Sequence, residues 1–70
     1  MPLTPQEKRI FELIGRGMSN REIAEEMYLA EKTVKNYVSN LLAKLGMRRR
    51  SEAAAFAARL EERDRGRGGV

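Results

Sequence analysis

Apolar residues recur along this chain with the spacing of amphipathic helices, and the clearest run covers residues 31–45. At about 100° per residue, one stripe of this run contains Val34, Val38, Leu41 and Leu45, with Tyr37 and Leu42 at its edges. A stripe of this width predicts one helix whose apolar side packs against a core. The other segments of the chain are then expected to supply that core.

The opposite face of the same helix carries cationic, amide, hydroxyl and small side chains, namely Lys32, Lys35, Asn36, Ser39 and Ala43. Bulky acidic and apolar groups are missing from this face, so it suits the base edges and phosphates of a DNA groove. The same residues also fit the solvated side of an ordinary amphipathic helix. The helix by itself leaves both interpretations open.

Two capping-box signals precede this helix. Thr4, Pro5 and Glu7 have the spacing of an N-cap, a first helical proline and the returning acidic side chain, which predicts a helix from Pro5 to about Ile14. Its apolar face consists of Ile10, Phe11, Leu13 and Ile14. Either Gly15 or Gly17 can end it in the left-handed conformation.

Ser19 and Glu22 repeat the capping-box spacing and predict a short second helix that runs through Met27. Only residues 28–30 connect it to the long helix. Two helices joined by so short a turn, the second with a polar outer face, are typical of a helix-turn-helix. An ordinary helical hairpin has the same pattern, and DNA binding is favoured over it.

A fourth helix is expected after Gly46, which has the position of a C-cap, with Ser51 as its N-cap and its end near Glu62. Its core side contains Ala53, Phe56, Ala57 and Leu60. Its reverse side contains Ala54, Ala58 and Glu61. Alanines on an outer face reflect either high helix propensity or contact with a second copy of the helix, and we interpret these three residues as a dimer interface.

Residues 63–70 combine arginine, aspartate and glycine without an apolar anchor, so they are predicted to form a disordered basic and glycine-rich tail. The expected organisation is therefore one all-α, compact four-helix domain over residues 1–62, followed by this tail. Seventy residues leave no room for a second core.

Composition narrows the function. The chain has no Cys and no His, which removes the common nucleophile, general base and zinc ligands and argues against an enzyme, a bound metal or another cofactor. Fourteen Lys and Arg against ten Asp and Glu give a net charge of +4. No apolar run is long enough to span a membrane and no leader opens the chain, so we expect a cytoplasmic protein without a membrane partner.

Four motifs in this order and spacing resemble the LuxR-type helix-turn-helix domain of NarL/FixJ response regulators. They are Leu3-Thr-Pro-Gln-Glu7, Gly17-Met-Ser-Asn-Arg-Glu-Ile-Ala24, Thr33-Val-Lys-Asn-Tyr-Val38 and Lys44-Leu-Gly46. The stretches at residues 30–39 and 41–47 look particularly like the DosR/DevR-like regulators. Two positions depart from the family pattern, with Ala30 where a serine or threonine is common and Tyr37 where a histidine is common.

The resemblance implies a transcription regulator that binds double-stranded DNA as a homodimer, places the third helix in the major groove and acts as the effector domain of a two-component response regulator. Base edges would meet Lys32, Lys35 and Asn36. Phosphates would lie near Ser19, Asn20, Thr33, Tyr37, Lys44, Arg50 and Ser51. RNA polymerase is a further possible partner.

Two other functions remain open at this point. One is a promoter-binding module similar to sigma-factor region 4, which shares the first two motifs but acts as part of a polymerase. The other is a small helical adaptor that binds protein through the exposed side of its third helix. Pairing of two copies on DNA argues against the first, and DNA binding of any kind argues against the second.

Overall fold

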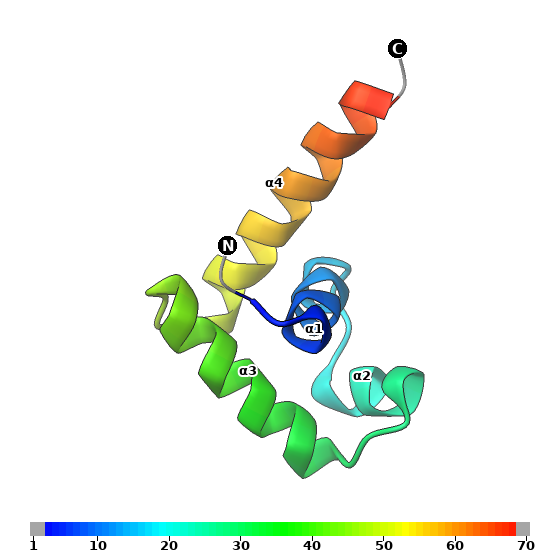
Figure 1. Ribbon diagram of the computed structural model, residues 1–70, viewed down its shortest axis with the longest axis vertical. Helices are drawn as coiled ribbons and strands as arrows, with labels where there is room; N and C mark the ends of the chain where they lie inside the picture. The colour runs from blue at the N-terminus through cyan, green and yellow to red at the C-terminus, as the bar shows by residue number, and fades with distance from the viewer. Residues whose placement is uncertain (1–2, 69–70) are drawn as a thin grey trace.

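The computed structural model describes the backbone of residues 3–68 and the side chains of residues 3–64. This part of the chain contains four helices and no strand: α1 (Pro5–Gly15), α2 (Asn20–Met27), α3 (Glu31–Leu45) and α4 (Arg50–Gly68). Helix α1 lies in the middle of the arrangement and contacts the other three helices (Figure 1). The predicted all-α fold with a helix-turn-helix is confirmed.

Capping boxes start the first two helices as predicted. The Glu7 amide donates to Thr4 Oγ1 at 3.2 Å, and the Thr4 amide donates back to Glu7 Oε1 at 2.9 Å. The same reciprocal pair joins Ser19 and Glu22 at 3.1 and 2.8 Å. Each box satisfies two amides that a helix start would otherwise leave without a partner.

Residues with positive φ lie at, or directly after, the C-caps of the first three helices. Gly46 closes α3 at φ 68°, and Gly17 makes the turn after α1 at φ 82°. Gly15 stays in the helix and serves a different purpose, because a Cβ added there would lie 2.6 Å from Cβ of Ala57. The glycine thus permits α1 and α4 to cross closely. Tyr28 ends α2 at φ 57°, a conformation unusual for a bulky residue.

Two predictions about α4 were wrong. Ser51 is not its N-cap, because the helix already begins at Arg50 and the Glu52 side chain accepts hydrogen bonds from the amides of Arg48 and Arg49. The helix also continues past Glu62 to Gly68, so the predicted tail is helical over residues 63–68. Once a helix has formed, each added residue contributes one hydrogen bond, and no proline interrupts this one. Residues 69–70 of the predicted tail lie outside the described residues.

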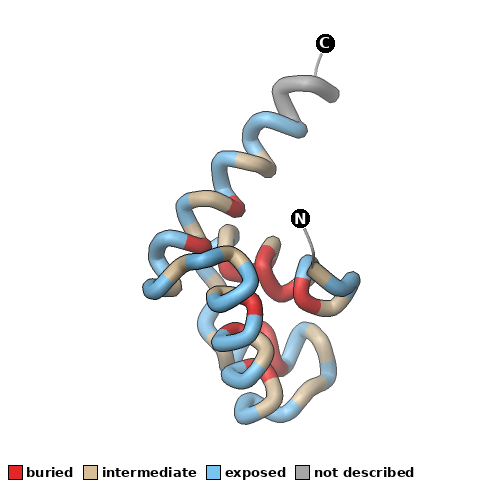
Figure 2. Tube along the Cα trace, turned by 60° about the vertical axis from the view of Figure 1, so that its left-hand side comes forward, coloured by how far each residue is buried: buried red, intermediate tan, exposed pale blue. Residues whose placement is uncertain are grey.

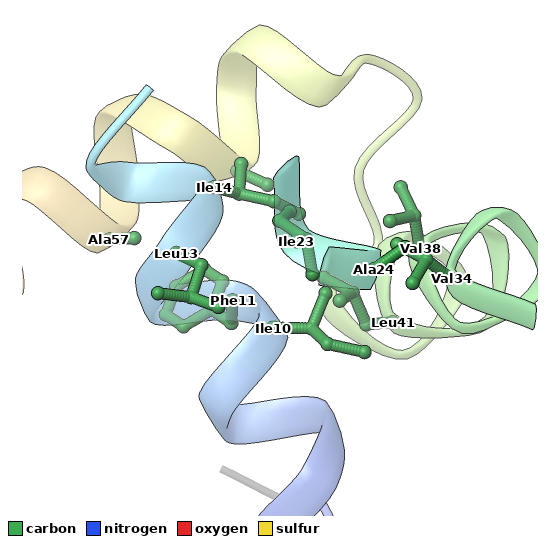
Figure 3. Packing of buried hydrophobic residues seen from close by; sticks show 11 residues of the cluster. Ile10, Phe11, Leu13, Ile14, Ile23, Ala24, Val34, Val38, Leu41 and Ala57 are labelled. Carbon is green, nitrogen blue, oxygen red and sulfur yellow. The ribbon is translucent and has the colours of Figure 1, made fainter. Parts of the chain in front are cut away.

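The core forms where all four helices meet (Figure 3), and its buried side chains are Ile10, Phe11, Leu13, Ile14, Ile23, Ala24, Val34, Val38, Leu41, Ala53 and Ala57. Phe11 meets half-buried Phe56 edge to face, with ring centroids 5.7 Å apart. The tube in Figure 2 shows buried positions gathered at the helix crossings, while the later part of α4 projects away from them. None of the helices is sufficiently long and apolar to cross a membrane within the part of the chain that the structure describes.

Candidate nucleic-acid interface

The buried stripe of α3 determines which of its side chains face outward. One face of α3 is buried against the other helices through Val34, Val38 and Leu41. The opposite face of the helix therefore points to the surface, and it carries Lys32, Lys35 and Asn36. All three side chains are exposed. The helix wheel predicted this orientation, since the two faces of an amphipathic helix point in opposite directions.

These three residues line an open hollow on the surface together with Asn20 of α2 and Glu31 of α3. Neither Lys32 nor Lys35 takes part in an ion pair among the residues with described side chains. Both charges are therefore available to an anionic ligand. The structure thus brings the predicted base-contacting residues together with Asn20, one of the predicted phosphate contacts.

Glu31 is part of the hollow although the sequence did not single it out. It occupies the first position of α3, where a carboxylate is favoured by the partial positive charge of the helix start. No side chain caps α3, because Ala30 stands at the N-cap. The signal that could have identified Glu31 is its spacing of four residues from Lys35, which places both on one face of the helix.

Arg50 joins the start of α4 to the start of α2. Its guanidinium donates to Oδ1 of Asn20 and to the backbone oxygen of Met18, the latter at 2.6 Å. Both residues of the pair, Arg50 and Asn20, were predicted to contact phosphates directly. In this structure the two side chains are hydrogen-bonded to each other. Arg50 therefore stabilises the turn before α2 that contains the N-cap Ser19.

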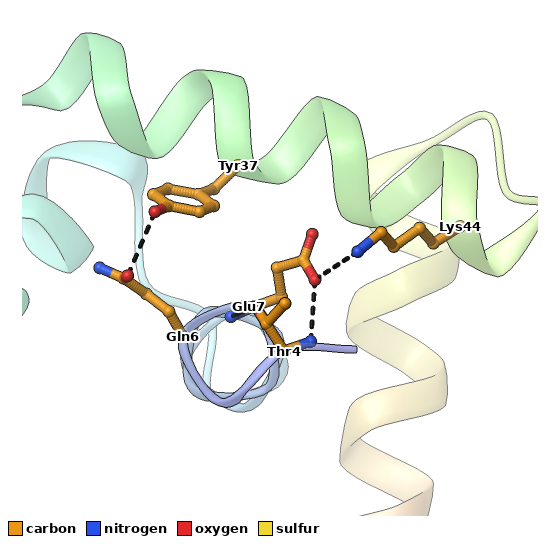
Figure 4. A network of polar contacts seen from close by, with 5 residues as sticks. All are labelled: Thr4, Gln6, Glu7, Tyr37 and Lys44. Atoms are coloured by element: carbon orange, nitrogen blue, oxygen red, sulfur yellow. Dashed lines mark hydrogen bonds and ion pairs between the residues drawn. The ribbon is translucent and has the colours of Figure 1, made fainter. Parts of the chain in front are cut away.

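Lys44 and Tyr37 also have partners within the protein (Figure 4). Lys44 Nζ lies 2.8 Å from Oε1 of Glu7, whose side chain is only 5% exposed. The Tyr37 hydroxyl donates to Oε1 of Gln6 at 3.1 Å. These two contacts attach α3 to the first turn of α1 and involve two further residues that were predicted to lie near phosphates.

Hydrogen bonds lower the pKa of both capping carboxylates. For Glu7 the largest cause is the hydrogen bond from Lys44, followed by the one from the Thr4 amide, while burial opposes them. For Glu22 the cause is the hydrogen bond from the Ser19 amide, followed by the one from the Ser19 hydroxyl. Each carboxylate is held in its charged form because that form accepts these hydrogen bonds.

The remaining predicted phosphate contacts lie at helix starts. Ser19 and Ser51 are exposed, and Thr33 is half-buried in the first turn of α3. Ser19 caps α2, whereas Ser51 lies inside the first turn of α4. Their hydroxyl groups are hydrogen-bond donors of the type that commonly contacts phosphate oxygens.

The predicted dimer residues lie on α4 with different degrees of exposure. Ala58 is exposed, but Ala54 is half-buried and packs against the core cluster. Glu61 is half-buried and its Oε1 lies 3.8 Å from Nε of Arg16 on α1. Of the three, Ala58 is therefore the one that projects fully outward.

Comparison with known proteins gives the family. The model of the family described as bacterial regulatory proteins, luxR family, matches residues 1–57. The chain is 59% identical over 59 residues to the DNA-binding transcriptional activator DevR/DosR of Mycobacterium tuberculosis, which covers 84% of this chain and 27% of that protein. It is 44% identical over 59 residues to the transcriptional regulatory protein LnrK of Bacillus subtilis, again 84% of this chain and 27% of the relative.

A shorter relative is matched over most of its length. The spore germination protein GerE of Bacillus subtilis is 42% identical over 60 residues, which are 86% of this chain and 81% of GerE. By contrast, the chain spans only about a quarter of DevR/DosR and LnrK. The matched segment includes α1, α2, α3 and the first part of α4, and this chain belongs to the luxR family of bacterial regulatory proteins.

Proposed function

We propose that this domain binds double-stranded DNA sequence-specifically and regulates transcription, with the exposed face of α3 in the major groove. The observation that carries the proposal is the exposed set of Lys32, Lys35 and Asn36 on a helix whose opposite face is locked into the core. Family membership supports DNA binding and transcription regulation as the activity of the domain.

The three side chains suit different base edges. Asn36 can pair with the N6 and N7 groups of adenine through both ends of its amide, while Lys32 and Lys35 can donate to the O6 and N7 acceptors of guanine. Each good contact of this type contributes about 1–3 kcal/mol of discrimination between bases. Asn20, on the rim of the same hollow, is close enough to join the polar surface that faces the groove.

Phosphate contacts supply a second part of the proposed interface. Ser19, Thr33 and Ser51 offer hydroxyl groups at the starts of three helices, where the partial positive charge of a helix dipole favours an anion. Lys44 contributes less charge to DNA than an unpaired cation would, because it already pairs with the carboxylate of Glu7. Arg50 keeps its full charge, because the Asn20 amide oxygen and the Met18 backbone oxygen are neutral, but these hydrogen bonds occupy part of its guanidinium. Their main task is to hold α3 and α2 in register.

The proposal includes a dimer on DNA. One module of this size covers about 600–1,000 Å² of protein surface on DNA, which is small for a specific site. Two copies that meet through the outer face of α4, centred on Ala58 with Ala54 and Glu61 beside it, would double the contact area. The whole protein is then a cytoplasmic response regulator whose effector domain is this chain.

Fluorescence anisotropy with two DNA duplexes tests whether Lys35 and Asn36 contact base edges. One duplex contains a site selected from a random pool and the other has a scrambled sequence. Lys35→Ala and Asn36→Ala should each weaken binding to the selected site by about 5- to 150-fold. The affinity for the scrambled duplex should change much less. Lys8→Ala is the matched control, because it removes the same charge from an exposed lysine on α1.

The selected sequences test the dimer as well. A dimer that reads DNA with two copies of α3 predicts two similar half-sites at a fixed spacing of about one helical turn, or a multiple of it. A single half-site with one bound copy would contradict the dimer, and equal losses on both duplexes for Lys35→Ala would show that this residue contacts only phosphates. Absence of binding to either duplex would contradict the proposed function.

A further inference from the structure

Glu31 places a carboxylate in the hollow that contains the predicted base contacts. It lines this hollow together with Asn20, Lys32, Lys35 and Asn36, and its side chain is exposed. An acidic residue is unexpected on a surface that is proposed to face a polyanion, because a carboxylate repels phosphate groups. Its presence in the hollow therefore requires a physical reason.

The helix start supplies part of this reason. Glu31 is the first residue of α3, where the partial positive charge of the helix N-terminus stabilises a carboxylate. An acidic residue elsewhere in the first turn would have the same effect. The helix start thus favours a negative charge in this region, but it does not determine what the Glu31 carboxylate contacts.

The Glu31 carboxylate is not paired with a nearby cation. Glu31 and Lys35 are four residues apart with the glutamate first, which is the arrangement that most favours an ion pair along a helix. Neither residue takes part in an ion pair among the residues with described side chains. The carboxylate and the ammonium group are therefore both open to a ligand, about one helical turn apart on one face of α3.

The acceptor chemistry of a carboxylate limits what Glu31 can contact on DNA. An ionised carboxylate accepts hydrogen bonds and donates none. The major groove presents two kinds of donor, the N4 amino group of cytosine and the N6 amino group of adenine. The adenine amino group lies beside the N7 acceptor, which repels a carboxylate, whereas the cytosine edge presents its amino donor without an acceptor. Cytosine is therefore the base that suits Glu31.

Lys35 has the complementary chemistry. Its ammonium group can donate to the O6 and N7 acceptors of guanine. Glu31 and Lys35 are separated by about 6 Å along the helix axis, and consecutive base pairs are about 3.4 Å apart. The two side chains can thus reach both bases of one G·C pair or bases of neighbouring pairs. In helix-turn-helix domains, the N-terminal residues of the recognition helix are those that meet base edges.

We propose that Glu31 is a specificity-determining residue that accepts a hydrogen bond from N4 of a cytosine, beside the base that Lys35 contacts. The inference rests on the proposed function, because it requires α3 to lie in the major groove. The carboxylate acts in two ways. It favours sites with cytosine at this position, and it repels DNA whose base edges offer it no donor.

Competition among single-base variants of the selected site tests this assignment. Each position of one half-site is changed in turn to the three other bases, and the affinities are compared by fluorescence anisotropy. The wild-type protein should prefer cytosine at one position by about 5- to 150-fold. Glu31→Ala should bind all four bases at that position with nearly equal affinity and keep its preferences elsewhere. Glu31→Gln should change the preference to adenine, because a glutamine amide pairs with N6 and N7 of adenine.

The scrambled duplex measures the repulsion. Glu31→Ala should bind it roughly two- to fivefold more tightly than the wild-type protein does, as expected when one like charge near a phosphate is removed. Glu26→Gln is the matched control, because it removes a carboxylate from the exposed side of α2 while Arg9 keeps Glu12 as an ion-pair partner at 3.9 Å. This control should leave the base preferences unchanged.

A conservative variant separates base contact from the role at the helix start. Glu31→Asp keeps the negative charge at the first position of α3 but shortens the side chain by one methylene group. It should retain the wild-type Tm and weaken the cytosine preference. A lower Tm for Glu31→Ala together with unchanged base preferences at every position would overturn the inference and leave Glu31 with its helix-start role alone.

The outcomes also separate this inference from the proposed function. Wild-type protein that selects a site without a cytosine preference dependent on Glu31 would overturn the inference alone. Wild-type protein that binds no DNA would overturn both. A selected site whose cytosine preference changes to adenine in Glu31→Gln would support both.

Discussion

Replacing Gly15 by alanine should loosen the crossing of α1 and α4. The added Cβ would lie 2.6 Å from Cβ of Ala57, 3.2 Å from the Ala58 nitrogen and 3.3 Å from the Ala57 carbonyl carbon. Ordinary van der Waals contacts begin near 3.4 Å, so the shortest contact is too close by about 0.8 Å. Because the obstacles are a Cβ and backbone atoms, no side-chain rotation relieves the overlap and the two helices must separate.

The expected net loss of stability for Gly15→Ala follows from two opposing effects. Overpacking of a tight interior costs about 1–3 kcal/mol, and we place this site in the upper part of that range because three atoms are involved. Alanine gains about 1 kcal/mol in helix propensity over glycine. A net loss of about 1–2 kcal/mol corresponds to a decrease in Tm of about 4–16 °C for a domain of this size.

Thermal unfolding followed by circular dichroism measures this decrease, and a double-mutant cycle identifies its cause. Ala57→Gly removes the Cβ that Gly15→Ala would meet, so the two changes together should cost less than the sum of their separate effects. Gly17→Ala is the control, because φ is 82° there and no atom lies within 4 Å of the added Cβ. It should destabilise by about 1–2 kcal/mol through backbone strain and show no coupling to Ala57→Gly. A higher Tm for Gly15→Ala would refute the close crossing.

Three further predictions concern pH, the α2–α4 contact and salt. The pKa values of Glu7 and Glu22 in the folded protein lie below the ordinary value of 4.5, so their ionised carboxylates stabilise the fold above that pH. This contribution to the free energy of unfolding is lost as the pH falls through the folded pKa values. In denaturant titrations between pH 7 and pH 3, Glu7→Gln should therefore lose less stability with falling pH than the wild-type protein does. Arg50→Lys should lower the Tm and weaken binding to selected and scrambled DNA by the same factor, because it loosens the turn before α2; a loss confined to the selected site would show base reading instead. DNA affinity should fall by about 100-fold or more between 50 and 200 mM salt, measured by anisotropy, and a flat response would exclude phosphate contacts as a main source of affinity.

Local signals in the sequence predicted most of the helical framework. The capping boxes at Thr4 and Ser19 and the glycine at position 46 determine where α1, α2 and α3 begin or end, since each acts on hydrogen bonds within a few residues. The apolar period of α3 likewise determined which side faces the core. Exposure of Lys32 and Lys35 follows from the same period, so this part of the candidate site was predictable.

The errors and omissions have physical reasons as well. Ser51 was predicted as the N-cap of α4. The amides of Arg48 and Arg49 instead donate to the Glu52 side chain, so the start of this helix does not require a serine cap. The contacts of Arg50 with Asn20 and of Lys44 with Glu7 join residues 30 and 37 positions apart, and no local pattern reports such distant pairs. The extension of α4 includes Asp64, Gly66 and Gly68, which have low helix propensity, so the sequence favoured an end near Glu62.

The ion pair between Lys44 and Glu7 also affects how the domain would approach DNA. A cation matched by a nearby carboxylate adds little to the field that a distant polyanion feels. Lys44 lies in the last turn of α3, whereas Lys32 and Lys35 lie in its first half and keep their charges unmatched among the described residues. In the proposed complex the attraction would therefore be uneven along α3 and stronger in its first half, so that half would approach DNA first. The encounter would then be oriented before α3 contacts a base.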